Sequence, residues 1–342
     1  MISRLVRTGI AAIVLGLCGS HAFAQTPTVR LVLDFAIQGQ QSPFVLAADG
    51  GYFARAGVNV QIDRGYGSAD AVAKVVSGAY DMAFADIGAL IQVNAKKVGP
   101  HVVNVFQVYN VAPMLVLSLK KANIRTPADL AGKRLASPPG ASSRVMFPLF
   151  AAANSLDPSS VSWLDVTPQL REMMLVRGQT DATTALVTDL AGLERLGIAE
   201  GDLNLMRYRD FGVALYGHCI LTTSDFASKN PDTVKRVVKG FAEALKAAIA
   251  EPAVAIAAIK KREPLIDDKV ERGRLELVID NAIVTDHVKH DGLGAVDPER
   301  MKQTIEMVAK SFNIPAADVS STYSPDYLPP RAELSLPQTQ RR

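Results

Sequence analysis

The chain has 342 residues, of which 48% are hydrophobic and 21% are charged, and its formal net charge is +3. This is the balance of a globular protein long enough for two lobes, and it excludes an intrinsically disordered chain. Two of the positive charges, Arg4 and Arg7, lie at the start, so the remainder is close to neutral and has no basic footprint for nucleic acid.

The first 24 residues have the pattern of a secretory signal peptide. Two arginines precede the apolar run GIAAIVLGLCG, and the small residues of AFA, which ends at Ala24, follow it. The run is shorter than the roughly 20 apolar residues of a membrane-spanning helix, and Leu17 is too bulky for lipoprotein processing at Cys18. We therefore expect cleavage after Ala24 and a periplasmic protein. Cleavage leaves Cys219 as the one cysteine, which excludes an internal disulfide.

The next part of the chain alternates between strand and helix patterns. Apolar and alternating runs predict four strands, at 29–35, 58–63, 81–86 and 101–109. Ser42 with Pro43 predicts the start of a helix after the first strand, and Ser68 predicts another after the second, because serine caps helices and proline suits their first turn. Repeated units of this kind predict a parallel sheet with helices on both faces.

A second unit of the same kind follows. Four further runs predict strands, at 114–120, 134–137, 161–166 and 181–187. Between them, 126–132 predicts a short helix, and Thr167 with Pro168 opens a longer one. The segment 215–226 predicts a strand that leads out of this unit. The rest of the chain predicts helices, at 231–250, 252–262, 268–285 and 297–312.

Two α/β units in one exported chain predict a two-lobed clamp. We expect residues 25–111 and 222–325 to form lobe 1, residues 112–221 to form lobe 2, and residues 326–342 to form a polar tail that is only partly packed. The chain then crosses twice between the lobes. A ligand would lie between them, at the carboxyl ends of the strands, and hinged closure would remove water from it.

Three stretches carry a resemblance to a known family. They are LDFAIQGQQSPFVLAADGGYFARAGVNVQI, GYGSADAVAKVVSGAYDMAFADIGALI and IRTPADLAGKRLASPPGASS. In this order they closely resemble the NMT1/THI5-like solute-binding proteins of ABC transporters, the thiamine-pyrimidine and sulfonate type. The resemblance implies a type II periplasmic binding-protein fold, an α/β architecture of two lobes with central mixed sheets and a two-strand hinge. It also implies capture of a small organic solute for an ABC permease in the inner membrane. Members of the family take pyrimidines, flavins, sulfonates, nitrate or aromatic acids, so the resemblance does not identify the solute.

The residues expected to contact the solute come from the loops that follow the strands. Helix starts at the serines offer free N–H groups, and the glutamine-rich loop, which faces the solute in the family, offers amides. In lobe 1 the candidates are Asp34, Phe35, Gln38, Gln40, Gln41, Ser42, Tyr66, Gly67, Ser68, Asp86 and Tyr109. In lobe 2 they are Gly140, Ser142, Ser143, Arg144, Thr184, Asp189 and Tyr216.

Three of these residues have a definite structural alternative. Tyr66 either covers a flat solute or packs between the lobes. Asp86 either accepts N–H groups of a pyrimidine or flavin or caps the next helix. Arg144 either clamps a carboxylate or sulfonate or lies on the solvated side of its helix. We favour a heteroaromatic solute (a pyrimidine, a thiamine precursor or a flavin-like compound), with a sulfonate or an aromatic carboxylate as the alternative.

No motif predicts catalysis. GYGSAD lacks the third glycine and the lysine of nucleotide-binding loops, and the sequence has no G-x-S-x-G elbow. His287 and His290 have a spacing that can hold a metal on one helix face, but no third ligand is marked. The cysteine-rich signature of the related pyrimidine-precursor synthase is absent. We therefore expect a monomeric binding protein with no cofactor, which serves either transport or a membrane sensor.

Overall fold

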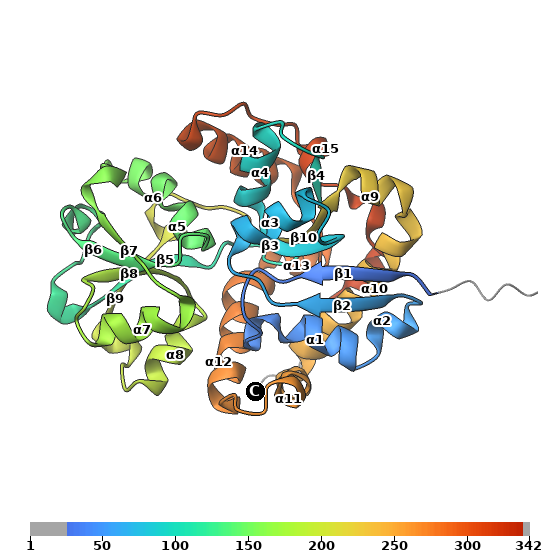
Figure 1. Cartoon of the computed structure of the whole chain (residues 1–342), viewed down its shortest axis with the longest axis horizontal. Coiled ribbons are helices and arrows are strands. Elements are labelled where there is room, and N and C mark those ends of the chain that lie inside the picture. Colours follow the sequence, from blue (N-terminus) through green and yellow to red (C-terminus); the bar gives the residue numbers. More distant parts are fainter. Residues whose placement is uncertain (1–25, 338–342) are drawn as a thin grey trace, which may run out of the picture.

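The computed structural model describes residues 26–337, so the predicted signal peptide and its cleavage after Ala24 lie outside the described residues. No helix within this part of the chain is long and apolar enough to cross a membrane. Its ten strands form two five-stranded sheets, one in each lobe, which lie beside each other in Figure 1.

The first sheet has the strand order β2-β1-β3-β10-β4. Its strands are β1 (Thr28–Val32), β2 (Asn59–Asp63), β3 (Met82–Asp86), β4 (Val102–Gln107) and β10 (His218–Thr223). β1 is parallel to β2 and β3, whereas β10 runs antiparallel between β3 and β4. The antiparallel strand makes this sheet mixed, as the family resemblance implied, rather than parallel throughout, as the repeated units predicted.

The second sheet has the order β7-β6-β8-β5-β9. Its strands are β5 (Met114–Leu119), β6 (Arg134–Ser137), β7 (Ser162–Asp165), β8 (Ala182–Leu186) and β9 (Leu203–Arg207). β6 is parallel to β7 and β8, and β5 is antiparallel to β8 and β9. The predicted strands are confirmed to within a few residues, and β9 is an additional edge strand that the sequence analysis did not predict.

Helices cover both sheets. In lobe 1 they are α1 (Ser42–Asp49), α2 (Tyr52–Arg55), α3 (Ser68–Val76), α4 (Ile87–Ala95), α9 (Ser224–Lys229), α10 (Pro231–Ala250), α11 (Pro252–Arg262), α12 (Asp268–Val278), α13 (Asp286–Asp291), α14 (Pro298–Phe312), α15 (Val319–Thr322) and α16 (Arg331–Leu334). In lobe 2 they are α5 (Ser142–Val145), α6 (Phe147–Ala153), α7 (Pro168–Val176) and α8 (Asp189–Arg195). The predicted helix at 268–285 ends earlier, because α12 passes into a π-helical turn at Ile279–Ile283.

The chain returns to lobe 1 earlier than the predicted boundary at 221/222. All of β10 belongs to the first sheet, so the boundary precedes His218. The two crossing segments pair with each other: the N–H of Ala112 donates to the Leu215 carbonyl, and the N–H of Gly217 donates to the Tyr109 carbonyl, both at 2.9 Å. The predicted boundary was wrong because the continuous apolar run marks a strand without marking the sheet to which it belongs.

The predicted tail at 326–342 is packed as far as residue 337. Leu334 in α16 is buried at 2% exposure, and its carbonyl accepts the N–H of Leu293 at 2.9 Å. This described part of the tail therefore belongs to lobe 1.

The lobes meet differently on their two sides. One apolar core runs through both lobes, from Ile87 through Phe147 and Phe150 to Met301 in α14. At the opposite end of the junction, α12 approaches α7 and α8 (Figure 1). There the contacts are made by charged groups, described below.

A close approach of two glycines joins the lobes beside the cleft. Gly67, at the start of α3, has φ +128° and ψ 155°, a backbone conformation that is essentially restricted to glycine. A Cβ atom at this position would lie 2.4 Å from the carbonyl oxygen of Gly140.

We expect Gly67→Ala to lower the free energy of unfolding by about 1–3 kcal/mol, because the added methyl group meets backbone strain and a backbone oxygen of the other lobe. Thermal unfolding measures the loss. Gly78→Ala is the matched control, since Gly78 also has a positive φ (+75°) but a Cβ there meets nothing within 4 Å. Equal losses in the two variants would show that the contact between the lobes has no steric effect.

Candidate functional site

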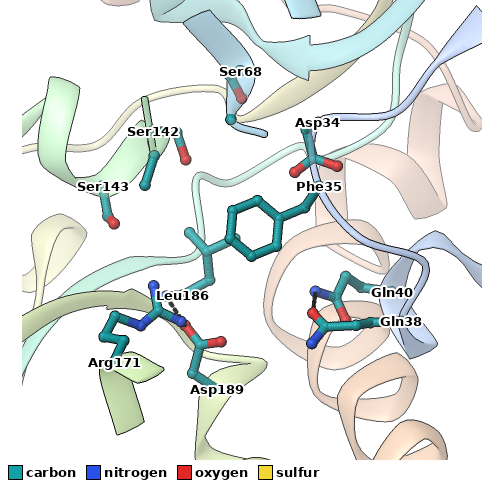
Figure 2. Close-up of a pocket in the computed structure, with 12 residues that line it drawn as sticks. Asp34, Phe35, Gln38, Gln40, Ser68, Ser142, Ser143, Arg171, Leu186 and Asp189 are labelled. Carbon is teal, nitrogen blue, oxygen red and sulfur yellow. Dashed lines mark hydrogen bonds and ion pairs between the residues drawn. The ribbon is translucent and has the colours of Figure 1, made fainter. Parts of the chain in front are cut away.

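A small cavity lies between the lobes: it can hold the centre of a water molecule over about 30 Å3, within a space of about 400 Å3 that includes its opening to solvent. Both lobes line it with residues at or beyond the carboxyl ends of strands, and Figure 2 shows their arrangement. The lining residues are Asp34, Phe35, Gln38, Gln40, Gly67, Ser68, Ala141, Ser142, Ser143, Arg171, Leu186 and Asp189. This is the position at which open α/β sheets hold ligands.

The loop after β1 supplies an aromatic ring and two amides. The ring of Phe35 points into the middle of the cavity (Figure 2). The Nε2 atom of Gln40 donates to Oε1 of Gln38 at 3.1 Å, and Oε1 of Gln40 is buried without a partner. A buried acceptor without a partner costs free energy, so this side of the cavity suits a solute that offers a donor.

A buried network of hydrogen bonds and ion pairs fixes the positions of Asp34 and Ser68. The Nε2 atom of His218 lies 3.1 Å from Oδ2 of Asp34 and 3.2 Å from Oγ of Ser68. His218 reaches this place because β10 is antiparallel to β3, in register with Asp86 at the carboxyl end of β3. The Asp86 carboxylate caps α4 by accepting the N–H of Gly88 at 2.9 Å and lies 3.9 Å from Nδ1 of His218.

The same network determines what the Ser68 hydroxyl can do. Its oxygen accepts the backbone N–H of Asp86 at 3.0 Å. The Nε2 atom of His218 faces the Asp34 carboxylate, which only accepts hydrogen bonds, so Nε2 carries a hydrogen and donates. The Ser68 oxygen therefore accepts the N–H of Asp86, and its hydroxyl cannot donate to Nε2 of His218, whose single hydrogen faces Asp34. The Ser68 hydroxyl has its own hydrogen free for an acceptor on a solute.

Burial and the neighbouring charges shift two pKa values in this network. Burial raises the pKa of Asp86 from 3.8 to about 6, although the charge of His218 and the N–H of Gly88 oppose the shift. Burial lowers the pKa of His218, but the hydrogen bond and charge of Asp34 and the charge of Asp86 outweigh it, so that the pKa of His218 lies above 6.5. Both groups therefore hold their protons to a higher pH in the folded protein than in the unfolded chain.

Lobe 2 supplies the opposite wall. Its charged part is an ion pair between Arg171 in α7 and Asp189 in α8, with NH2 of Arg171 2.5 Å from Oδ2 of Asp189. Asp189 also accepts the N–H of Leu186 at 2.8 Å, and Arg171 lies 3.4 Å from the Thr184 carbonyl. The Nε atom of Arg171 is buried without a partner. The wall is completed by the hydroxyls of Ser142 and Ser143 and by the side chain of Leu186.

Half of the predicted site residues line this cavity. They are Asp34, Phe35, Gln38, Gln40, Gly67, Ser68, Ser142, Ser143 and Asp189. Gln41 stands behind them, because its Nε2 atom donates to Oδ1 of Asp34 at 3.0 Å. Gly140 makes the backbone contact with Gly67 at the rim of the cleft.

Two predicted residues lie outside the cavity lining and have other partners. Tyr66 is 62% exposed and makes cation–π contacts with Arg64 and Lys74, and its ring is not part of the cavity lining. NH1 of Arg144 lies 2.6 Å from Asp165, which neutralises its charge outside the cavity. In both cases the sequence locates the loop correctly but does not reveal in which direction the side chain leaves it.

The remaining predicted residues are buried away from the lining. Ser42 lies within the packed start of α1 and Asp86 beneath the cavity. Tyr109 packs edge-on against Phe84. Thr184 donates to Ser137 at 2.8 Å, and the hydroxyl of Tyr216 accepts the N–H of Asp297 at 2.9 Å. In this structure these side chains support the fold.

The sequence analysis missed Ala141, Arg171 and Leu186, and it gave His218 no role. One signal could have found Arg171. It is the fourth residue of α7, where a cation opposes the helix dipole and therefore requires a nearby anion. Asp189 is that anion.

The two histidines considered for a metal share one carboxylate. His287 and His290 lie 3.0 and 2.8 Å from the two oxygens of Asp291. Among residues 26–337, no cluster of three or more histidine, cysteine, aspartate or glutamate side chains is arranged to hold a metal ion.

The model of the family described as NMT1/THI5 like matches residues 38–255. This chain belongs to that family. No curated protein matches it.

Solved structures confirm the periplasmic binding-protein fold. A protein from Bordetella bronchiseptica RB50 is 20% identical, with a TM-score of 0.70, over 88% of this chain and 95% of that one. The alkanesulfonate-binding protein SsuA from Xanthomonas axonopodis pv. citri, bound to MOPS, is 16% identical, with a TM-score of 0.65, over 87% and 98%. The nitrate-binding protein NrtA from Synechocystis PCC 6803 is 12% identical, with a TM-score of 0.66, over 92% of both chains. At these identities the likeness establishes the fold and leaves the solute open.

The raised pKa values predict how stability depends on pH. Asp86 ionises near pH 3.8 in the unfolded chain and near 6 in the folded protein, so its contribution to stability falls as the pH rises between these values. The contribution of His218 is complete below 6.5 and is also lost as the pH rises through its folded pKa. Relative to wild type, Asp86→Asn should gain about 2 kcal/mol in free energy of unfolding between pH 4 and 7.

Urea unfolding at a series of pH values measures this difference. Asp157→Asn is the control, because hydrogen bonds from Ser159 lower the pKa of Asp157 and the trend for that variant should have the opposite sign. An Asp86→Asn curve parallel to that of wild type would contradict the proposed protonation of the network.

Proposed function

We propose that the protein is an extracytoplasmic solute-binding protein that captures a small organic solute between its lobes and delivers it to an ABC permease. The observation that carries the proposal is the cavity, because both lobes supply its lining from strand ends. Membership of the NMT1/THI5-like family supports the same function. The periplasmic location rests on the predicted signal peptide.

We further propose that the solute is heteroaromatic. Phe35 offers a ring in the middle of the cavity, and Ala141 and Leu186 add apolar surface. Around them, Ser68 offers a donor and Gln40 a free acceptor. A flat ring with polar edges, such as a pyrimidine or a flavin-like compound, would use all of these groups.

The charged groups around the cavity show no excess of negative charge. Two carboxyl groups line the cavity, those of Asp34 and Asp189, and so does the guanidinium of Arg171. Two further basic groups, those of His218 and Arg274, pair with the two lining carboxylates. Asp86, Glu172 and Glu271 lie behind these basic groups, and burial raises the pKa of all three. These charges therefore do not select a neutral solute over an anionic one.

The alternative, a sulfonate or an aromatic carboxylate, has one observation in its favour. The Nε atom of Arg171 is buried beside the cavity without a partner and could donate to an anionic oxygen. Among the structural relatives, SsuA from Xanthomonas is named as an alkanesulfonate-binding protein. Solute identification decides between the two classes.

Binding without chemistry is the function that the side chains support. Ser68 and His218 resemble part of a catalytic triad, but Nε2 of His218 already carries the hydrogen that it donates toward Asp34, so it cannot take a proton from Ser68. Burial, with a smaller effect of the Asp86 charge, raises the pKa of the Cys219 thiol, which is fully buried and unsuited to nucleophilic attack.

Native mass spectrometry of the purified protein, followed by chemical identification of any small molecule it carries, tests the proposal directly. The expected result is a heteroaromatic compound that rebinds with one-to-one stoichiometry in calorimetry and is recovered unchanged. Conversion of the compound during incubation would establish an enzyme instead. A sulfonate or carboxylate would support the alternative solute class.

We expect Phe35→Ala to weaken binding of the identified compound by about tenfold or more, because stacking on an aromatic side chain contributes about 1–3 kcal/mol. Calorimetry measures the affinity. Tyr66→Ala is the matched control, since that ring is exposed outside the cavity and its loss should change affinity by less than about twofold. Equal effects of the two substitutions would rule out a special role for Phe35.

A further inference from the structure

A buried cluster of charges joins the lobes beside the cavity. Arg274, in α12 of lobe 1, is 5% exposed and lies between carboxylates of both lobes. Its NH1 atom is 3.4 Å from Oδ1 of Asp189, and its NH2 atom is 3.5 Å from Oε1 of Glu172, both in lobe 2. On its own helix, Nε lies 3.6 Å from Oε1 of Glu271.

The cluster reaches the solute-lining groups on both sides. In lobe 1, the other oxygen of Glu271 accepts the N–H of Gly39 at 2.6 Å, in the loop that carries Gln38 and Gln40. In lobe 2, Asp189 holds Arg171. Arg274 is therefore the link between the glutamine loop of one lobe and the charged wall of the other.

The cluster favours lobes that are together. When the lobes separate, Arg274 loses Asp189 and Glu172, and the charges return to water. While they are together, loss of the guanidinium would leave three buried carboxyls around a single remaining cation, and an unpaired buried charge is strongly destabilising. Burial and the charge of Asp189 raise the pKa of Glu172, whereas the charges of Arg274 and Arg171 oppose the rise, so loss of Arg274 would raise this pKa further.

We propose that Arg274 is a positioning residue that holds the lobes closed and thereby sets the solute-lining groups of both lobes in place. The proposal rests on the proposed capture of a solute between the lobes. Its ion pairs with both lobes form without a solute, so closure by Arg274 is testable before any solute is known and independently of whether one is found.

Small-angle X-ray scattering of the protein without added solute tests the proposal. Wild type should be compact, with a scattering profile that matches the structure. Arg274→Gln should have a larger radius of gyration, because the closed-to-open ratio falls by at least about tenfold when the bridging charge is removed. Arg274→Lys should restore part of the compaction, since it returns the charge without the forked geometry.

Arg272→Gln is the matched control, because it removes the same charge from the same helix where Arg272 pairs with Glu276 on the exposed side. Its profile should equal that of wild type. Circular dichroism confirms that each variant is folded, and Glu172→Gln, which removes a lobe 2 partner, replaces Arg274→Gln if that variant fails to fold. The proposal would be overturned if the folded Arg274→Gln variant, or its replacement, had the same radius of gyration as wild type. This includes the case in which wild type is already as expanded as the variant.

Discussion

The structure depends on the double crossing of the chain between two sheets. The crossing segments pair through Ala112 with Leu215 and through Tyr109 with Gly217, which fixes the lobes side by side. This pairing makes the carboxyl ends of strands from both sheets meet at one place, and the cavity lies there. It also directs β10 back into the first sheet in the antiparallel sense, so that His218 arrives at the end of β3.

As a consequence, the polar groups of the site are held in position by hydrogen bonds and ion pairs to other side chains. Asp34 is fixed by Gln41 and His218, and the Ser68 hydroxyl accepts the N–H of Asp86. In lobe 2, Asp189 fixes Arg171. Groups held in this way lose little freedom when a solute binds, which favours affinity. The lobes share an apolar core near α14 and meet through ions near α12, so any opening would expose charged rather than apolar surface on the α12 side.

Much of this could be predicted from the sequence, because strands and helices follow from the periodicity of apolar residues and from residues typical of helix starts. Ser42 and Ser68 marked the starts of α1 and α3 correctly, but the prediction that they cap these helices was wrong, since the N-cap positions are Gln41 and Gly67 and no side chain caps either helix. The lobe to which β10 belongs could not be predicted, because the pairing of strands that are distant in the sequence leaves no local sequence pattern. The edge strand β9 was missed because its residues are only partly buried. The loops of the site were found from strand ends, but the outward directions of Tyr66 and Arg144 depend on Lys74 and Asp165, which are partners from other elements.

The measurement that tests the capture of a solute between the lobes most directly is hydrogen–deuterium exchange with and without the compound that the protein carries. Peptides that cover residues 64–70 of lobe 1 and 139–146 of lobe 2 contain the helix starts on opposite walls of the cavity. Amide hydrogens in both peptides should exchange more slowly when the compound is added, and this protection should rise in parallel in the two peptides as more of the protein binds the compound. Protection confined to one lobe, or found only outside the cleft, would contradict the account.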